Sequence, residues 1–147
     1  MKILVLYGSL TGNTEFVANQ IADFLNNHHI ENDLFNAQEF SPKNILAYDL
    51  LILGSSTWDY GQFQEDFAAF FEEIKELDFK NKKFIVFGCG DTGYEHFCKA
   101  VDLIEDFLTL KQAKKIASSL KIDGYPQQPI NQQLINDWLT TLIKSLT

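Results

Sequence analysis

Short runs of consecutive apolar residues alternate along this chain with longer segments in which apolar residues recur every three or four positions. A continuous apolar run predicts a strand that is buried on both faces of a sheet, and the longer spacing predicts an amphipathic helix. The predicted strands are residues 3–6, 33–36, 49–54, 83–88 and 116–122. The predicted helices are residues 13–27, a short helix after Ser41-Pro42, residues 64–75, residues 95–110 and a final helix capped by Asn131.

Strands that alternate with helices are typical of an α/β protein, because the right-handed crossover between two parallel strands lays a helix over the sheet. The chain has 147 residues, 46% of them hydrophobic, which is enough to fill one core. No repeat, low-complexity tract or linker divides it. We therefore predict one domain over residues 1–147, built on a five-stranded parallel sheet with helices on both faces.

The charge balance excludes several classes of partner. The chain carries 20 acidic residues against 12 lysines and has no arginine, so its formal net charge is −8. Nucleic acids and anionic membranes are bound by clustered positive charge, and we expect neither as a partner. The sequence has no secretory signal and no apolar run long enough to span a membrane. We expect a cytoplasmic monomer without a metal site, in which Cys89 and Cys98 are reduced and buried.

Small polar and aromatic residues gather directly after three of the predicted strands, at residues 8–15, 55–61 and 88–95. In an open α/β sheet, ligands bind outside the carboxyl ends of the strands, at the point where the strand order reverses. One ligand can contact all three loops if the first, third and fourth strands are neighbours. The spatial order 2-1-3-4-5 meets that condition.

The first loop has the composition of an anion-binding turn. Its glycines permit close approach of the backbone, and the loop opens a helix whose amino end carries partial positive charge. Hydroxyl and amide donors come from Ser9, Thr11, Asn13 and Thr14. Because Gly12 is followed by Asn13, the Gly-Lys-Ser/Thr sequence of a nucleoside triphosphatase loop is absent. An ordinary strand-to-helix turn with hydroxyl capping is the alternative.

The second and third loops each place one aromatic residue beyond a strand end, Trp58 and Tyr94. Either ring can pack into the core, which is the usual fate of a single aromatic residue. Two such rings in neighbouring loops can instead enclose a flat ring system, where contacts with the ring faces add to the area buried.

The stretches YGSLTGNTE (residues 7–15), GSSTW (54–58) and FGCGDTGYEHFC (87–98) together resemble the flavodoxins, small FMN-binding electron carriers with strand order 2-1-3-4-5. The similarity covers the whole chain. The direct run from the fifth strand into the last helix resembles the short-chain type.

The resemblance implies cofactor-binding roles in each loop. The implied phosphate-loop residues are Ser9, Leu10, Thr11, Gly12, Asn13 and Thr14. The implied second-loop residues are Ser56, Thr57 and Trp58, where Ser56 and the indole N–H of Trp58 lie near the phosphate and ribitol and Trp58 covers the inner ring face. Asp59, beside Tyr60, presents a backbone carbonyl to the ring. In the third loop, Tyr94 covers the outer face, and the pyrimidine edge is surrounded by Cys89, Gly90, Asp91, His96, Phe97 and Cys98.

The resemblance further implies a low-potential one-electron carrier, not an enzyme, that cycles between the semiquinone and the hydroquinone. It would accept electrons from a reductase such as a flavodoxin/ferredoxin-NADP reductase and pass them to redox enzymes. The acidic residues of two helices would form a docking face for such partners: Glu65, Asp66, Glu72, Glu73, Glu76, Asp102, Glu105 and Asp106.

Two residues of these loops raise separate questions. Asp59 stands where many relatives have glycine, and a non-glycine residue at positive φ costs about 1–2 kcal/mol. Relief of a penalty of about 1 kcal/mol in Asp59→Gly would stabilise the semiquinone by about 40 mV, which a redox titration measures. His96 is either a solvated residue at a helix start or a group near the flavin that makes the second couple depend on pH.

Three other classes of protein are alternatives to an electron carrier. An FMN-dependent NAD(P)H oxidoreductase of related fold is the enzyme alternative, although the chain has short loops and no arginine to hold a second dinucleotide phosphate. A receiver domain would need an acidic pair beside the first strand to hold Mg²⁺, and this chain lacks that pair. A low-molecular-weight phosphatase would need an arginine six residues after its cysteine, but the residue six positions after Cys89 is Glu95. Both classes are therefore excluded by single residues.

Overall fold

The computed structural model describes residues 1–8, 12–58, 62–63, 65–91, 93 and 97–146, with residues 58 and 62 described by their backbone. Strands and helices alternate along it, as predicted. In chain order the elements are β1 (Ile3–Gly8), α1 (Asn13–Asn27), β2 (Asp33–Asn36), the 3-10 helices η1 (Ala37–Glu39) and η2 (Pro42–Ala47), β3 (Leu50–Ser55), β4 (Thr57–Trp58), β5 (Gln62–Phe63), α2 (Glu65–Ile74), β6 (Lys83–Gly90), α3 (Lys99–Leu110), β7 (Lys114–Lys115), β8 (Leu120–Asp123) and α4 (Pro129–Leu146).

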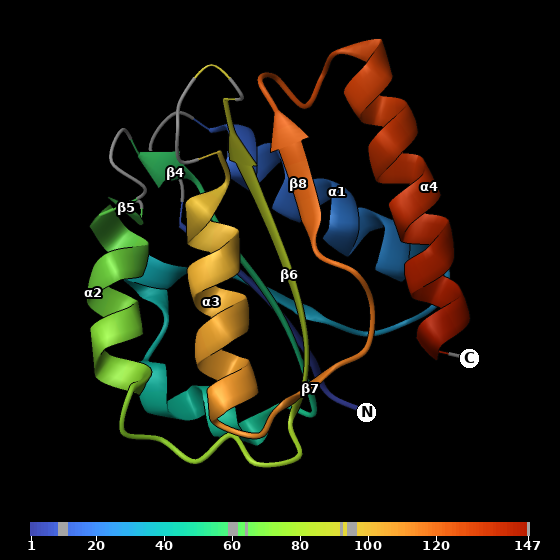
Figure 1. Ribbon diagram of the computed structural model, residues 1–147. Coiled ribbons are helices and arrows are strands. Elements are labelled where there is room, and N and C mark those ends of the chain that lie inside the picture. The colour runs from blue at the N-terminus through green and yellow to red at the C-terminus, as the bar shows by residue number, and fades with distance from the viewer. Residues whose placement is uncertain (9–11, 59–61, 64, 92, 94–96, 147) are drawn as a thin grey trace.

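The main sheet has the order β2-β1-β3-β6, followed by β7 and β8, which share the last position beside β6. Every pairing in it is parallel (Figure 1). β7 pairs with the start of β6, where Lys114 lies opposite Lys83, and β8 pairs with its end, where Asp123 lies opposite Gly90. The predicted α/β class and the order 2-1-3-4-5 are therefore confirmed.

The prediction of one continuous fifth strand over residues 116–122 was wrong. The strand is interrupted between Lys115 and Leu120, although the backbone N–H of Ile116 still donates to the carbonyl oxygen of Phe84 in β6 at 3.2 Å. The indole Nε1 of Trp138 donates to the carbonyl oxygen of Ser118 at 2.7 Å, and the Ser119 hydroxyl donates to Glu105 at 2.7 Å. These hydrogen bonds to two helices hold the segment away from the ladder.

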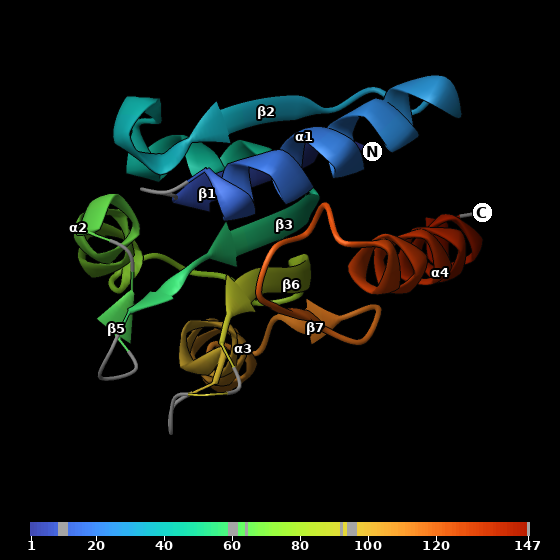
Figure 2. The ribbon, with the colours of Figure 1, turned by 90° about the horizontal axis from the view of Figure 1, so that it is seen from above.

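Both faces of the sheet are buried, as continuous apolar runs predict. Alternate residues of each strand enter one of two core clusters, because successive side chains of a strand point to opposite faces. One cluster lies under α1 and α4 and includes Val5, Val17, Ile21, Ile52, Ile135 and Leu139. The other lies under α2 and α3 and includes Leu4, Leu6, Phe67, Phe70, Val101 and Ile104. Figure 2 shows the two pairs of helices on either side of the sheet.

The last two helices start at different residues from those predicted. α3 begins at Lys99 instead of residue 95, because Cys98 has a left-handed φ of 49°, which the interior of an α-helix does not allow. Residue 95 itself lies outside the described residues. α4 begins at Pro129, so Asn131 lies in its first turn and is not its cap. The buried Asn131 amide donates to the carbonyl oxygens of Asp123 at 2.9 Å and Tyr125 at 2.8 Å, and so anchors the loop before the helix.

Two further observations complete the architecture. A two-stranded antiparallel hairpin, β4 with β5, follows β3 and was not predicted from the sequence. None of the helices in the described residues combines the length and the apolar character that a membrane crossing requires.

Candidate functional site

The three loops that the sequence singled out follow neighbouring strands. β1 lies beside β3, where Gly8 is opposite Ser55, and β3 lies beside β6, where Gly54 is opposite Phe87. The carboxyl ends of these three strands therefore form one edge of the sheet, which we call the cofactor edge. The condition for a ligand shared by the three loops is met.

The first and second loops are joined by a hydrogen bond between two hydroxyl groups. Oγ1 of Thr14, in the first turn of α1, lies 2.6 Å from Oγ of Ser56, which follows β3. Thr14 is fully buried and Ser56 is partly exposed. One of the two hydroxyls donates its proton to the other, and the hydroxyl that accepts keeps its own proton, which can rotate toward an anion at the cofactor edge.

Gly12 supplies the backbone turn that precedes α1. Its φ of 92° is a conformation that side chains disfavour, and a Cβ atom placed there would meet nothing within 4 Å. A side chain at this position would therefore point into open space. The first turn of a helix also has backbone N–H groups without acceptors inside the helix. This combination fits a phosphate held by neutral donors, which a chain without arginine requires.

Thr57 fixes the second loop to the start of α3. Its Oγ1 accepts a hydrogen bond of 2.9 Å from the backbone N–H of Ala100 in the first turn of α3. The residue at the N-cap position of that helix, Cys98, makes no capping bond with its side chain. Thr57 thus caps α3 from a different loop, which the sequence analysis did not predict because the partner is 43 residues away.

Two glycines allow the loops to approach closely. A Cβ atom at Gly88 would lie 2.5 Å from the carbonyl oxygen of Ser55, and one at Gly90 would lie 2.9 Å from the backbone nitrogen of Cys98. Beyond Gly90, the exposed Asp91 accepts a 2.7 Å hydrogen bond from the N–H of Gly93, so its carboxylate shapes the loop.

The two cysteines are free and buried, which confirms the expectation of a reduced pair. Cys89 belongs to the core cluster under α1 and α4, and Cys98 belongs to the cluster under α2 and α3. Burial raises the pKa of Cys89 to about 12 and the pKa of Cys98 to about 12. Both thiols therefore stay protonated at neutral pH.

The described residues that the structure brings together at the cofactor edge are Gly12, Asn13, Thr14, Ser56, Thr57, Gly90 and Asp91. Phe97 is half-buried and packs against the α2–α3 core cluster. Seven predicted site residues lie outside the described residues, as does the side chain of Trp58: Ser9, Leu10, Thr11, Asp59, Tyr60, Tyr94 and His96. Their roles stay predictions.

The chemistry of the described donors is that of anion binding. Among the residues that the structure describes, no group of three His, Cys, Asp or Glu side chains could hold a metal ion. The fold is that of a doubly wound α/β protein with the strand order 2-1-3-4-5, and at its switch point lie hydroxyls, a left-handed glycine and a helix amino end, which suit a phosphate-bearing ligand.

Comparison with known proteins identifies the family. The family model described as Flavodoxin matches residues 5–138. A curated flavodoxin from Maridesulfovibrio salexigens is 42% identical over 130 residues, which cover 86% of this chain and 89% of that protein. The crystal structure of oxidised Flavodoxin 2 from Bacillus cereus has a TM-score of 0.91 and 33% identity, over 98% of this chain and 99% of that one. A Fusobacterium nucleatum flavodoxin bound to flavin mononucleotide shares the fold, with a TM-score of 0.83 and 21% identity over 97% of both chains.

The chain belongs to the flavodoxin family. The resemblance stated from the three sequence motifs is confirmed. So are the expectations, at the level of the family, of an FMN-binding electron-transfer protein that is not itself an enzyme.

Proposed function

We propose that the chain holds the FMN phosphate between its first two loops and works as a low-potential one-electron carrier. The phosphate donors are the predicted residues 9–14 together with Ser56, and the ring lies between Trp58 and Tyr94. The observation that carries the proposal is the Thr14–Ser56 hydroxyl pair, which lies at the helix start that follows the left-handed turn at Gly12. FMN supplies reversible one-electron chemistry when bound, and the protein sets its potential.

The described residues favour a low potential. A site that holds a phosphate through hydroxyls and amides brings no positive side chain to compensate the charge of the phosphate. The chain adds a net charge of −8, and Asp91 is exposed at the same edge. Negative charge near the ring disfavours each added electron, and about 1.4 kcal/mol shifts a one-electron couple by about 59 mV.

The acidic docking face is proposed chiefly on α2. Glu65 and Glu73 of this helix are exposed, as is Glu76, which lies two residues beyond its end. On α3, two carboxylates are already paired with lysines: Oδ1 of Asp102 lies 2.8 Å from Nζ of Lys121, and Oε1 of Glu105 lies 2.6 Å from Nζ of Lys115. Less of the negative charge of α3 is therefore available to a partner. The partners proposed are basic redox proteins such as a flavodoxin/ferredoxin-NADP reductase. We propose that the chain binds them as a monomer in the cytoplasm. An NAD(P)H oxidoreductase would instead turn over NADPH without an added reductase.

The phosphate site is tested by titrating the apoprotein with FMN and with riboflavin, which lacks the phosphate, and following flavin fluorescence. Ser56→Ala removes one hydroxyl from the proposed site, and Ser145→Ala on α4 is the matched control. A hydrogen bond to a charged group contributes about 1.5–3 kcal/mol, so Ser56→Ala should weaken FMN binding about 10-fold to 100-fold and leave riboflavin binding unchanged. An equal loss for both ligands would contradict a phosphate role for Ser56.

A further inference from the structure

Half of the lysines are confined to two short segments. Residues 79–83 (FKNKK) and 111–115 (KQAKK) hold three lysines each, or six of the 12 in the chain, and neither contains an acidic residue. With six positive charges here and −8 for the whole chain, the remainder carries −14. The two segments are therefore an exception in a strongly acidic protein.

The two segments lie side by side. The N–H of Asn81 donates to the carbonyl oxygen of Gln112 at 3.1 Å, and the N–H of Lys114 donates to that of Lys82 at 2.7 Å. Lys83 and Lys114 are register partners on β6 and β7. This lysine edge, residues 79–83 with 111–115, is at the amino ends of the strands and so at the opposite end of the sheet from the cofactor edge (Figure 1).

Three of these six lysines have structural roles. The ammonium group of Lys82 donates to the carbonyl oxygens of Leu46 at 2.7 Å and Tyr48 at 2.9 Å. Lys115 is paired with Glu105, and the Lys111 ammonium lies 5.8 Å from the centroid of the Phe107 ring.

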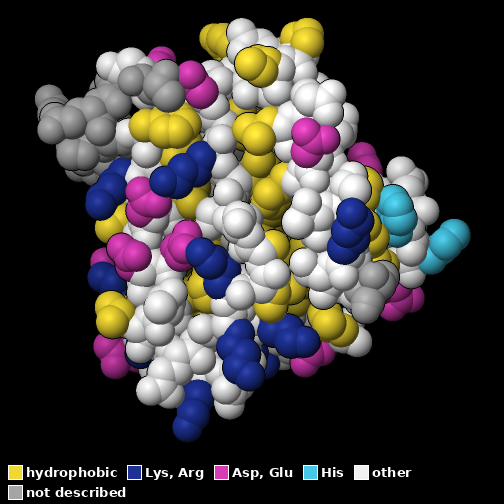
Figure 3. All heavy atoms as spheres, turned by 45° about the vertical axis from the view of Figure 1, so that its right-hand side comes forward, with side chains coloured by type: hydrophobic (Ala, Val, Ile, Leu, Met, Phe, Trp, Pro, Cys, Tyr) yellow, Lys and Arg dark blue, Asp and Glu magenta, His cyan; other side chains and the backbone are white. Residues whose placement is uncertain are grey.

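The ammonium groups of Lys80, Lys83 and Lys114 are different. Within the described part of the chain they make no hydrogen bond or ion pair, and all three residues are exposed. Like charges on neighbouring strands repel each other, so no contact among the described residues accounts for this grouping. In Figure 3, dark blue lysine side chains gather at the lower end of the molecule.

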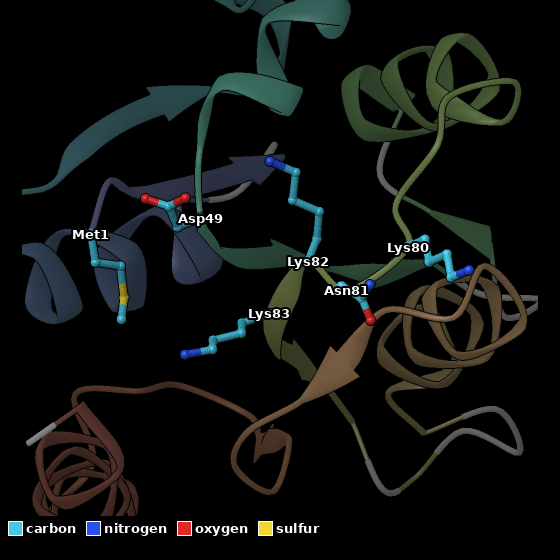
Figure 4. Close-up of a pocket in the computed structure, with 6 residues that line it drawn as sticks. All are labelled: Met1, Asp49, Lys80, Asn81, Lys82 and Lys83. Atoms are coloured by element: carbon cyan, nitrogen blue, oxygen red, sulfur yellow. The ribbon is translucent and has the colours of Figure 1, made fainter.

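The shape of the lysine edge does not suit a small anion. A hollow of about 410 Å³ lies there, lined by Met1, Asp49, Lys80, Asn81, Lys82 and Lys83. Figure 4 shows the side chains of Lys80, Lys82 and Lys83 pointing in different directions, so they do not converge on one ion. The Asp49 carboxylate also lines the hollow, where it accepts a hydrogen bond from the backbone N–H of Lys2 at 2.7 Å. Separated positive charges suit an extended ligand whose negative charges are also separated.

We propose that the lysine edge binds an acidic segment of a partner protein and leaves the cofactor edge free. A bilayer or a long nucleic acid would extend past this edge and be repelled by the rest of the protein, which carries a net charge of −14. An acidic peptide segment is short enough to contact only the lysines. Lysine also lacks the planar fork with which arginine recognises phosphate. Because the two edges are at opposite ends of the sheet, one molecule can hold this partner and exchange electrons at the same time. The proposal does not depend on the proposed FMN site.

The test measures binding of a fluorescein-labelled oligoglutamate peptide to the FMN-loaded protein by fluorescence anisotropy. Lys83→Glu with Lys114→Glu reverses two charges in the lysine edge. The control, Lys99→Glu with Lys144→Glu, changes the net charge equally at the other end of α3 and on α4. The lysine-edge variant should bind the peptide at least about 10-fold more weakly than the control at low ionic strength. Binding should also weaken as ionic strength rises from about 10 mM to about 150 mM, where the Debye length falls from about 30 to about 8 Å.

Equal binding by the two variants would overturn the proposal, as would no binding at low ionic strength. Phosphatidylserine vesicles or duplex DNA that bind more tightly than the peptide at the same ionic strength would assign the lysine edge to another class of ligand and also overturn it. Peptide binding that persists without FMN supports the proposal, so this test and the riboflavin test can fail separately.

Discussion

At the scale of single residues, the site depends on small hydroxyl side chains. The hydroxyl oxygens of Thr14, at the start of α1, and Ser56, which follows β3, lie 2.6 Å apart. The Thr57 hydroxyl accepts a hydrogen bond from the backbone N–H of Ala100. Neutral donors of this kind can hold an anion without neutralising it. The absence of arginine, visible in the sequence, thus becomes a reason to expect a low potential.

The buried thiols give a prediction at the same scale. With a pKa of about 12, each cysteine is about one part in 10⁴ thiolate at about pH 8, and the thiolate is the reactive form. We expect neither Cys89 nor Cys98 to react with Ellman's reagent in the native protein, and both to react after denaturation. Rapid reaction of either thiol under native conditions would contradict the burial described here.

Gly88 tests the close approach of β6 to β3. A methyl group at this position would be forced against the Ser55 backbone, so Gly88→Ala should reduce the free energy of unfolding by about 1–3 kcal/mol in a urea titration. In the control, Gly93→Ala, the nearest atom is a side-chain oxygen of Asp91 at 3.0 Å, which can move aside. Equal stability of the two variants would mean that the strands can separate at little cost.

At the scale of elements, the start of α3 depends on a residue outside the helix. Thr57 caps it, and the left-handed Cys98 sets the direction in which the chain enters the helix. The second loop and the third helix are therefore expected to respond together when Thr57 is changed.

Removal of the cap should be measurable in the apoprotein. Thr57→Val loses the acceptor for the Ala100 N–H and should lower the free energy of unfolding by about 1 kcal/mol, whereas Thr57→Ser keeps the oxygen and should lower it less. Urea unfolding followed by circular dichroism compares the two. A valine variant as stable as the serine variant would remove the capping role.

The elements also show how far the sequence could predict the structure. Continuous apolar runs identified β1, β3 and β6, and the helical spacing identified α1 at its observed bounds, because these patterns follow from local geometry and burial. The break in the fifth strand depends on Trp138 and Glu105, the start of α3 on Thr57, and the anchoring of the last loop on Asn131. All of these are tertiary hydrogen bonds, which no local pattern contains. The motifs located the cofactor edge, but the residue pairs that join its loops could be found only in the fold.

At the scale of the whole molecule, charge is separated along the strands. The described α-helices run opposite to the strands, so their amino ends face the cofactor edge. Acidic residues stand in the first turns of α1, α2 and α3, where they interact favourably with the helix dipole, and Lys111 follows the end of α3. This separation of charge is what the proposed docking of a basic redox partner at the cofactor edge requires.

The most direct test of the central claim is a reductive titration of the FMN-loaded protein at a controlled potential, followed by visible absorption. A carrier that binds FMN in an uncompensated acidic site should be reduced in two separate one-electron steps, the second at a potential well below that of free FMN. A single two-electron step at the potential of free FMN would contradict the account.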